Sequence, residues 1–245
     1  MARADANEAR IFERILCGVD GTPQSLTAVQ QAARLQDPDG RLQIAAAADF
    51  AKAAQAGIGA PRAAELLERE AEAALAAARA VAPAADHKLL DGNPAAVLLH
   101  EAEGEQATLV AVGSHGRGRV AGRLLGTVAA RMLHDAPCSV LVARAARDPE
   151  TWPQSVVAGV DGSAQSADAL AVARSIAERF AGTLDQLEEE PARAVDALTA
   201  ASDSADLVVV GSRGLHGLKS LGSVSERVAH RASSSVLVVR AVPSS

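Results

Sequence analysis

Three glycines and a threonine are the residues of this 245-residue chain whose types and spacing most clearly suggest chemistry. Gly113, Gly116 and Gly126 follow the apolar run 108–112, and Thr127 precedes the helix-like segment 128–134. Glycines at a strand exit let the backbone approach a ligand closely, and the N–H groups at a helix start favour an anion. The pattern predicts a phosphate-type anion site, although a glycine-rich joint of this kind can also be a simple tight turn.

The same pattern returns about a hundred residues later in a shortened form. Gly211 and Gly214 follow the apolar run 207–210, and Gly222 precedes Ser223. The spacing here is Gly-x2-Gly-x7-Gly-Ser, which is two residues shorter than Gly-x2-Gly-x9-Gly-Thr in the first copy. This second loop, with Asp161, is either a second ligand site or a structural remnant of one.

A wider repeat accompanies the two glycine loops. Residues 17–25 (CGVDGTPQS) align with residues 158–166 (AGVDGSAQS) at an offset of 141, which places Asp20 opposite Asp161. The glycine loops align at an offset of 98, so the second copy has lost 43 residues between its first helix and its loop. The chain therefore reads as a tandem duplication with a truncated second copy.

In the first copy, apolar runs alternate with helix-like segments. This alternation indicates a doubly wound α/β domain with a parallel sheet covered on both faces, in which ligands bind at the carboxyl ends of strands. Asp20 and the Gly113 loop both follow such ends. The expected strands are 14–20, 41–48, 86–91, 107–113 and 139–144, and the expected helices are 25–36, 61–82, 94–103 and 126–135.

The second copy keeps the first strand and helix, 155–161 and 166–180, and the last strand-loop-helix-strand unit within 206–240. Residues 182–190 leave room for at most one short strand before a helix at 191–201. Because about two strands and a helix are missing, we expect apolar sheet surface to need cover from another domain or chain. The expected domains are 1–148 and 152–245. Trp152 either packs at their joint or covers local surface.

The composition argues against several classes of protein. A net charge of −6 and an aromatic content of 2% do not suit a nucleic-acid-binding surface or a base-stacking platform. No apolar leader or 18-residue apolar run appears, so we expect a cytoplasmic protein without membrane contact. Cys17 and Cys138 fit small buried residues, and no zinc-type cluster is present. No hydrolase or metalloprotease motif points to an enzyme.

These residues together resemble the universal stress protein family, whose nucleotide-binding members carry Gly-x2-Gly-x9-Gly-(Ser/Thr) after the fourth strand and an Asp at the end of the first. The tails 136–142 and 234–238 are also typical of that family. The resemblance extends from about residue 14 to the end of the chain. It implies two tandem domains of strand order 3-2-1-4-5, the second one truncated.

The resemblance also implies a ligand: ATP or a related adenine nucleotide such as AMP or cyclic AMP, with or without Mg²⁺. Gly18 and Asp20 would flank base and ribose, and Ala47, where the family more often has Val, would form the adenine wall. Val112 would pack beneath the base. Ribose and phosphates would contact Gly113, Gly116, Gly126, Thr127 and Val128. Arg117, like Arg119 and Arg123, could either contact phosphate or be a solvated loop residue.

The first function that the sequence favours is a universal stress protein that binds an adenine nucleotide mainly in its N-terminal domain and acts through conformation or association. The alternative is a nucleotide-independent dimerisation scaffold, and a nucleotide hydrolase or transferase has the least support. The second site would comprise Asp161, Gly211, Gly214, Gly222 and Ser223. Whether the last strands pair within one chain or between two chains is left open.

Overall fold

The computed structural model describes residues 11–116, 125–212 and 223–240. The first half of the described chain contains β1 (Phe12–Val19), α1 (Pro23–Leu35), β2 (Gln36–Ala48), α2 (Phe50–Ala54), the 3₁₀ turn η1 (Gly57–Gly59), α3 (Ala60–Val81), β3 (Asp86–Asp91), α4 (Pro94–Gly104), β4 (Leu109–Gly113), α5 (Thr127–Asp135) and β5 (Ser139–Ala143). The second half contains β6 (Ser155–Val160), α6 (Ala164–Arg179), β7 (Thr183–Glu188), α7 (Pro191–Ala201), β8 (Leu207–Gly211), α8 (Ser223–Arg231) and β9 (Ser235–Val239).

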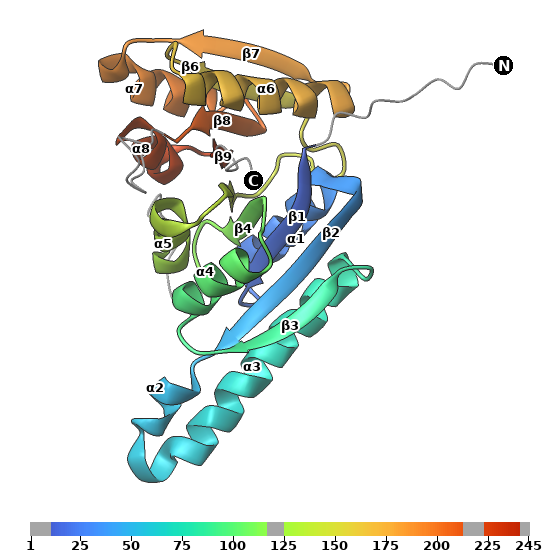
Figure 1. Ribbon diagram of the computed structural model, residues 1–245, viewed down its shortest axis with the longest axis vertical. Coiled ribbons are helices and arrows are strands. Elements are labelled where there is room, and N and C mark those ends of the chain that lie inside the picture. Colours follow the sequence, from blue (N-terminus) through green and yellow to red (C-terminus); the bar gives the residue numbers. More distant parts are fainter. Residues whose placement is uncertain (1–10, 117–124, 213–222, 241–245) are drawn as a thin grey trace, which may run out of the picture.

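Within the described residues, the strands form one nine-stranded sheet in the order β3-β2-β1-β4-β5-β9-β8-β6-β7 (Figure 1). The N-terminal half has the expected order 3-2-1-4-5, and its neighbouring strands are all parallel. The C-terminal half keeps the equivalents of the first, fourth and fifth strands and is also internally parallel. The α/β fold and the shorter second half predicted from the sequence are confirmed.

The pairing of β5 with β9 joins the two halves within one chain. Val140, Leu141 and Val142 lie opposite Val238, Leu237 and Val236 in antiparallel register, the one antiparallel pair in the described sheet. All six side chains are fully buried. The question that the sequence left open is therefore answered for this chain: its own last strands pair with each other.

A single strand replaces the missing part of the second copy, as expected. β7 pairs with β6 in parallel and forms one edge of the sheet. The sequence predicted apolar sheet surface here that another domain or chain would cover; among the described residues, no large apolar side chain beside β7 is exposed. Thr183, Asp185, Gln186 and Glu188 are the exposed positions of this strand, so its open edge is polar. The exposed large hydrophobic side chains of the described chain are Ile58, Leu66 and Leu89, all in the N-terminal half.

Two elements of the N-terminal half were not expected from the sequence. The short helix α2 begins after Asp49, whose side chain accepts a hydrogen bond from the Lys52 N–H at 2.9 Å. The turn η1 then leads into α3, which runs beyond the sheet together with α2 (Figure 1). The second strand begins at Gln36 rather than at residue 41, because Gln36 already pairs with Phe12 of β1, ahead of an irregular step that leads to the Arg14–Arg41 pair.

Trp152 lies at the joint between the halves. Of the two roles considered for it, packing at the joint or covering local surface, the structure therefore shows the first. Its side chain is 1% exposed and belongs to a hydrophobic cluster that includes Ile15 of β1 and Val156 of β6. Its Nε1–H donates to the carbonyl of Asp206 at 3.1 Å. Trp152 therefore packs one half of the chain against the other.

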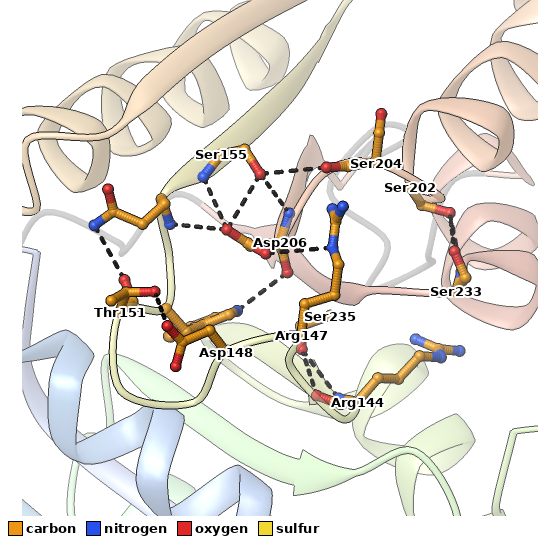
Figure 2. A network of polar contacts seen from close by, with 12 residues as sticks. Arg144, Arg147, Asp148, Thr151, Ser155, Ser202, Ser204, Asp206, Ser233 and Ser235 are labelled. Carbon is orange, nitrogen blue, oxygen red and sulfur yellow. Dashed lines mark hydrogen bonds and ion pairs between the residues drawn. The ribbon is translucent and has the colours of Figure 1, made fainter.

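Polar contacts hold the linker between the halves against the start of β8 (Figure 2). Oδ2 of Asp206 accepts hydrogen bonds from the Gln154 N–H at 2.9 Å, the Ser155 N–H at 3.0 Å and the Ser155 hydroxyl at 3.1 Å. Arg147 contributes an ion pair at 3.8 Å to the other oxygen of the same carboxylate. One aspartate thus fixes both the end of the linker and the beginning of β6.

Candidate functional site: two clefts at the strand ends

An open cleft lies at the carboxyl ends of β1, β2 and β4 in the N-terminal half. This is the edge at which parallel α/β sheets bind ligands. The structure brings together nine of the site residues predicted for this half: Gly18, Asp20, Ala47, Val112, Gly113, Gly116, Gly126, Thr127 and Val128. Arg117, with Arg119 and Arg123, lies outside the described residues.

Asp20 is held in a fixed orientation where β1 ends. Its Oδ1 accepts hydrogen bonds from the Thr22 N–H at 3.0 Å and the Thr22 hydroxyl at 2.6 Å. Thr22 also accepts from the Ser25 N–H at 3.3 Å and caps α1, while Pro23 occupies the first helical turn. Gly21 between them has φ of 79°, which disfavours other residues. The sequence Asp-Gly-Thr-Pro therefore builds the turn that places the carboxylate in the cleft.

Backbone atoms leave no room for a side chain on Gly113, and the Asp20 carboxylate lies where a side chain on Gly116 would begin. A Cβ on Gly113 would lie 2.8 Å from the carbonyl carbon of Gln24, and a Cβ on Gly116 would lie 2.6 Å from Oδ2 of Asp20. The Gly126 N–H donates to the carbonyl of Ser114 at 2.8 Å, which closes the loop. The first and last described parts of the loop are thus brought together beside Asp20.

Helix α5 starts at the same place with an uncapped N-terminus. Gly126 is its N-cap residue and has no side chain to accept a hydrogen bond from the first turn. The first N–H groups of a helix have no partner within the helix, and the helix dipole makes this end partly positive. An anion in the cleft could accept from these groups, so the arrangement suits a phosphate or carboxylate.

The remaining walls of the cleft are aliphatic. Val112 and Val128 lie beside the loop, and Ala45, Ala47 and Leu98 line the other part of the cleft. These side chains offer a dry surface for a flat ring, and the nearby Asp20 carboxylate can accept hydrogen bonds from hydroxyl groups. The cleft thus combines an apolar end with an anion-favouring end.

Several lining residues were not among those predicted. Ser25, the last residue of the repeated segment 17–25, and Leu98 of α4 also line the cleft, and only the fold brings them there. His115 is a further lining residue; it is partly buried, with Nδ1 3.0 Å from the Ser114 hydroxyl. In the sequence, its position within the glycine loop could have indicated this role.

A second cleft occupies the equivalent place in the C-terminal half. Asp161 and Gly211 line it, as predicted, and Ser223 is the first residue of α8. Oδ1 of Asp161 accepts from the Ser163 N–H at 3.1 Å and its hydroxyl at 2.6 Å, which repeats the Asp20 geometry. Gly214 and Gly222 lie outside the described residues. The truncated copy has therefore kept a cleft.

Two kinds of feature are absent from the described part of the chain. In the described ranges, no group of three or more His, Cys, Asp or Glu side chains is placed to hold a metal ion. No helix within those ranges is both long enough and apolar enough to cross a bilayer.

The fold and the paired clefts define the class of this protein as a tandem doubly wound α/β protein with ligand-type clefts at the strand ends. The model of the universal stress protein family matches residues 11–144 and 185–240. Because the two matches together cover most of the chain, this chain belongs to the universal stress protein family, as a tandem member.

Individual relatives agree with this assignment. Universal stress protein Rv2005c of Mycobacterium tuberculosis is 33% identical over an alignment of 184 residues that covers 55% of this chain. The match spans 62% of that relative's length. The crystal structure of a universal stress protein from Archaeoglobus fulgidus shares the fold with a TM-score of 0.69 at 17% identity, covering 93% of this chain and 98% of that one. A universal stress protein crystallised in complex with cAMP matches 55% of this chain and 98% of its own at 26% identity, with a TM-score of 0.38.

Proposed function

We propose that the N-terminal cleft binds ATP or a related adenine nucleotide such as AMP or cyclic AMP, with or without Mg²⁺. The protein would act in a stress response through ligand-dependent conformation or association, as a binding protein and not as an enzyme. The observation that carries this proposal is the meeting of Asp20, the glycine loop and the uncapped start of α5 at one cleft. Membership of the family supports it.

Each part of a nucleotide has a chemically suitable counterpart in this cleft. The phosphates would lie against the glycine loop and the N-terminus of α5, where backbone N–H groups favour negative charge. The ribose hydroxyls would donate to the Asp20 carboxylate. The adenine ring would lie between the aliphatic side chains of Ala47 and Val112.

Helix α5 offers a route from the ligand to the rest of the protein. Its C-terminal carbonyls, at Leu133 and Ala136, accept hydrogen bonds from the guanidinium of Arg240, which follows β9. His134 Nε2 lies 3.2 Å from Oε1 of Glu226 in α8. A ligand that shifts the start of α5 would therefore disturb contacts with the C-terminal half. The proposed boundary between two domains lies at residues 148–152.

Isothermal titration of the full chain with ATP, AMP and cyclic AMP, with and without Mg²⁺, tests the proposal. We expect one of these ligands to bind, and Gly126→Val to abolish that binding because the loop closes tightly around Gly126. Absence of binding by the wild-type chain to all three would contradict the proposal. It would favour the nucleotide-independent scaffold, in which the sheet serves only for association.

A further inference from the structure

The two clefts have floors of the same kind but differ in one wall. Leu98, Val112 and Val128 of the first cleft have Leu198, Val210 and Val224 as counterparts in the second. The floor glycines match as well. A Cβ on Gly159 would meet Leu198 at 3.0 Å and Val210 at 3.3 Å, and one on Gly18 would meet Leu98 at 2.7 Å and Val112 at 3.4 Å. Both floors therefore suit the same kind of flat apolar ring.

Strand register identifies the residues that make the wall different. Gly18 pairs with Ala45 of β2, and Gly159 pairs with Leu187 of β7. Two residues after Ala45, Ala47 lines the first cleft, and two residues after Leu187, Glu189 lines the second. The second wall therefore carries a larger aliphatic side chain and a carboxylate where the first has two methyl groups.

Glu189 differs from the other carboxylate of its cleft in having no internal partner. Asp161 accepts hydrogen bonds from Ser163, whereas Glu189, which is partly buried, makes no hydrogen bond or ion pair with any described residue. A carboxylate offers only acceptor atoms, and a partly desolvated one gains most from a ligand that brings N–H donors. The cleft therefore favours a ring with adjacent N–H donors at its edge.

Guanine and adenine differ in the hydrogen-bonding groups at the edge that would face Glu189. Guanine presents two adjacent donors, N1–H and the 2-amino group, which match the two oxygens of a carboxylate. Adenine presents one donor, its 6-amino group, beside N1, whose lone pair would face a carboxylate oxygen. A site built on paired hydrogen bonds strongly rejects an analogue that leaves one group unmatched.

We propose that the C-terminal cleft selects a guanine nucleoside or nucleotide, with its ring on the floor of Leu198 and Val210 and its N1–H and 2-amino groups donating to Glu189. Asp161 would accept from the ribose, as Asp20 would in the other cleft. This proposal does not depend on adenine binding in the N-terminal cleft, because the two clefts are lined by different residues.

The test is isothermal titration of the full chain with GMP and AMP in the background of Gly116→Val, which fills the space beside Asp20 and removes the N-terminal cleft from the measurement. We expect GMP to bind at least about tenfold more tightly than AMP. Glu189→Gln should reverse this preference, since an amide offers one acceptor and one donor and so matches adenine. Glu188→Gln, an exposed neighbour that does not line the cleft, is the matched control and should leave the preference unchanged.

A second measurement on the unmodified chain keeps the test independent of whether Gly116→Val folds. Methyl NMR should show GMP shifting Leu187 and Leu198 while leaving Leu98 unshifted. Equal affinity for GMP and AMP, no binding of either nucleotide at the C-terminal cleft, or a preference that survives Glu189→Gln would each overturn the proposal. Binding of spermidine in place of GMP would overturn it too, by showing that Glu189 serves a cation and not a base. ATP binding reports separately on the N-terminal cleft. Gly116→Val should abolish it, and Glu189→Gln should leave it intact.

Discussion

The guanidinium of Arg144, just after β5, donates a hydrogen bond of 2.5 Å to the carbonyl of Ala229 in α8. Arg144 also donates to the carbonyl of Ser234 at 3.3 Å. Arg240, just after β9, makes the reciprocal contacts with the carbonyls at the end of α5. Each half of the chain therefore caps the C-terminus of a helix that belongs to the other half. Those two helices are the ones that begin at the glycine loops.

Replacing Arg144 by Met should destabilise the whole chain. The change removes the donors for two carbonyls at the joint and leaves those acceptors without their partners. A charge-assisted hydrogen bond of this kind contributes about 1.5–3 kcal/mol, so we expect a loss of about 2–4 kcal/mol in the free energy of unfolding. Urea unfolding followed by circular dichroism and by Trp152 fluorescence measures it.

Arg147→Met is the matched control for Arg144→Met. Arg147 lies in the same linker, its side chain is 57% exposed, and its ion pair with Asp206 is 3.8 Å long. Exposed pairs contribute at most about 1 kcal/mol, so this variant should unfold nearly like the wild type. Equal effects of the two substitutions would show that the swapped helix caps do not hold the joint.

Gly116→Ala should weaken ATP binding without a comparable loss of stability. The added methyl group would lie 2.6 Å from Oδ2 of Asp20, so either the loop or the carboxylate has to move within the proposed ribose site. We expect roughly tenfold weaker binding, the usual scale for one misplaced methyl group in a pocket. Gly104→Ala, at the open end of α4 with no atom within 4 Å of the new Cβ, is the control. Unchanged ATP affinity in Gly116→Ala would place the ligand elsewhere.

Glu101→Gln should reduce stability at neutral pH but not in acid. Burial raises the pKa of Glu101, but hydrogen bonds from Lys88 at 2.7 Å and Gln43 at 2.6 Å outweigh it, so the folded-state pKa is lower than usual. The carboxylate therefore stabilises the fold above its unfolded pKa, and this contribution disappears as the pH falls through the folded value.

We expect Glu101→Gln to lose about 1–2 kcal/mol at pH 7, and the difference from the wild type to shrink as the pH falls through the folded-state pKa. Chemical unfolding at a series of pH values measures this, with the exposed Glu72→Gln as the control. A difference that stays constant from pH 7 to pH 3 would assign the effect to packing and not to ionisation.

Both cysteines should resist modification by thiol reagents in the folded protein. Burial raises the pKa of Cys138 to about 12, although the nearby Arg240 opposes this shift, and burial raises the pKa of Cys17 further. At pH 8 the thiolate of Cys138 would be roughly one part in ten thousand, and neither sulfur is open to the reagent. Ellman's reagent should label both thiols only after denaturant is added. Rapid labelling of the native chain would show that the joint near β5 opens readily.

Much of this protein follows from local sequence. The repeat of 17–25 in 158–166 indicates the duplication, and the alternation of apolar runs and helices indicates a parallel sheet. The strand end at Asp20 and the glycine spacing predicted five residues, and the family resemblance implied four more; all nine line one cleft. Such features are visible because turns, caps and close backbone approaches restrict the residue types at individual positions.

Other features were decided only by the tertiary structure. The β5–β9 pairing, the burial of Trp152 and the exchange of helix caps between Arg144 and Arg240 all join residues that are far apart in the sequence. The apolar surface expected beside the truncated copy is absent from the described chain, because β7 ends the sheet with a polar edge. Glu189 became a wall residue only through the register of β7 on β6. Sequence determines which residues can form a strand or a turn, but contacts between strands depend on how the whole sheet packs, and those contacts set which side chains meet in each cleft.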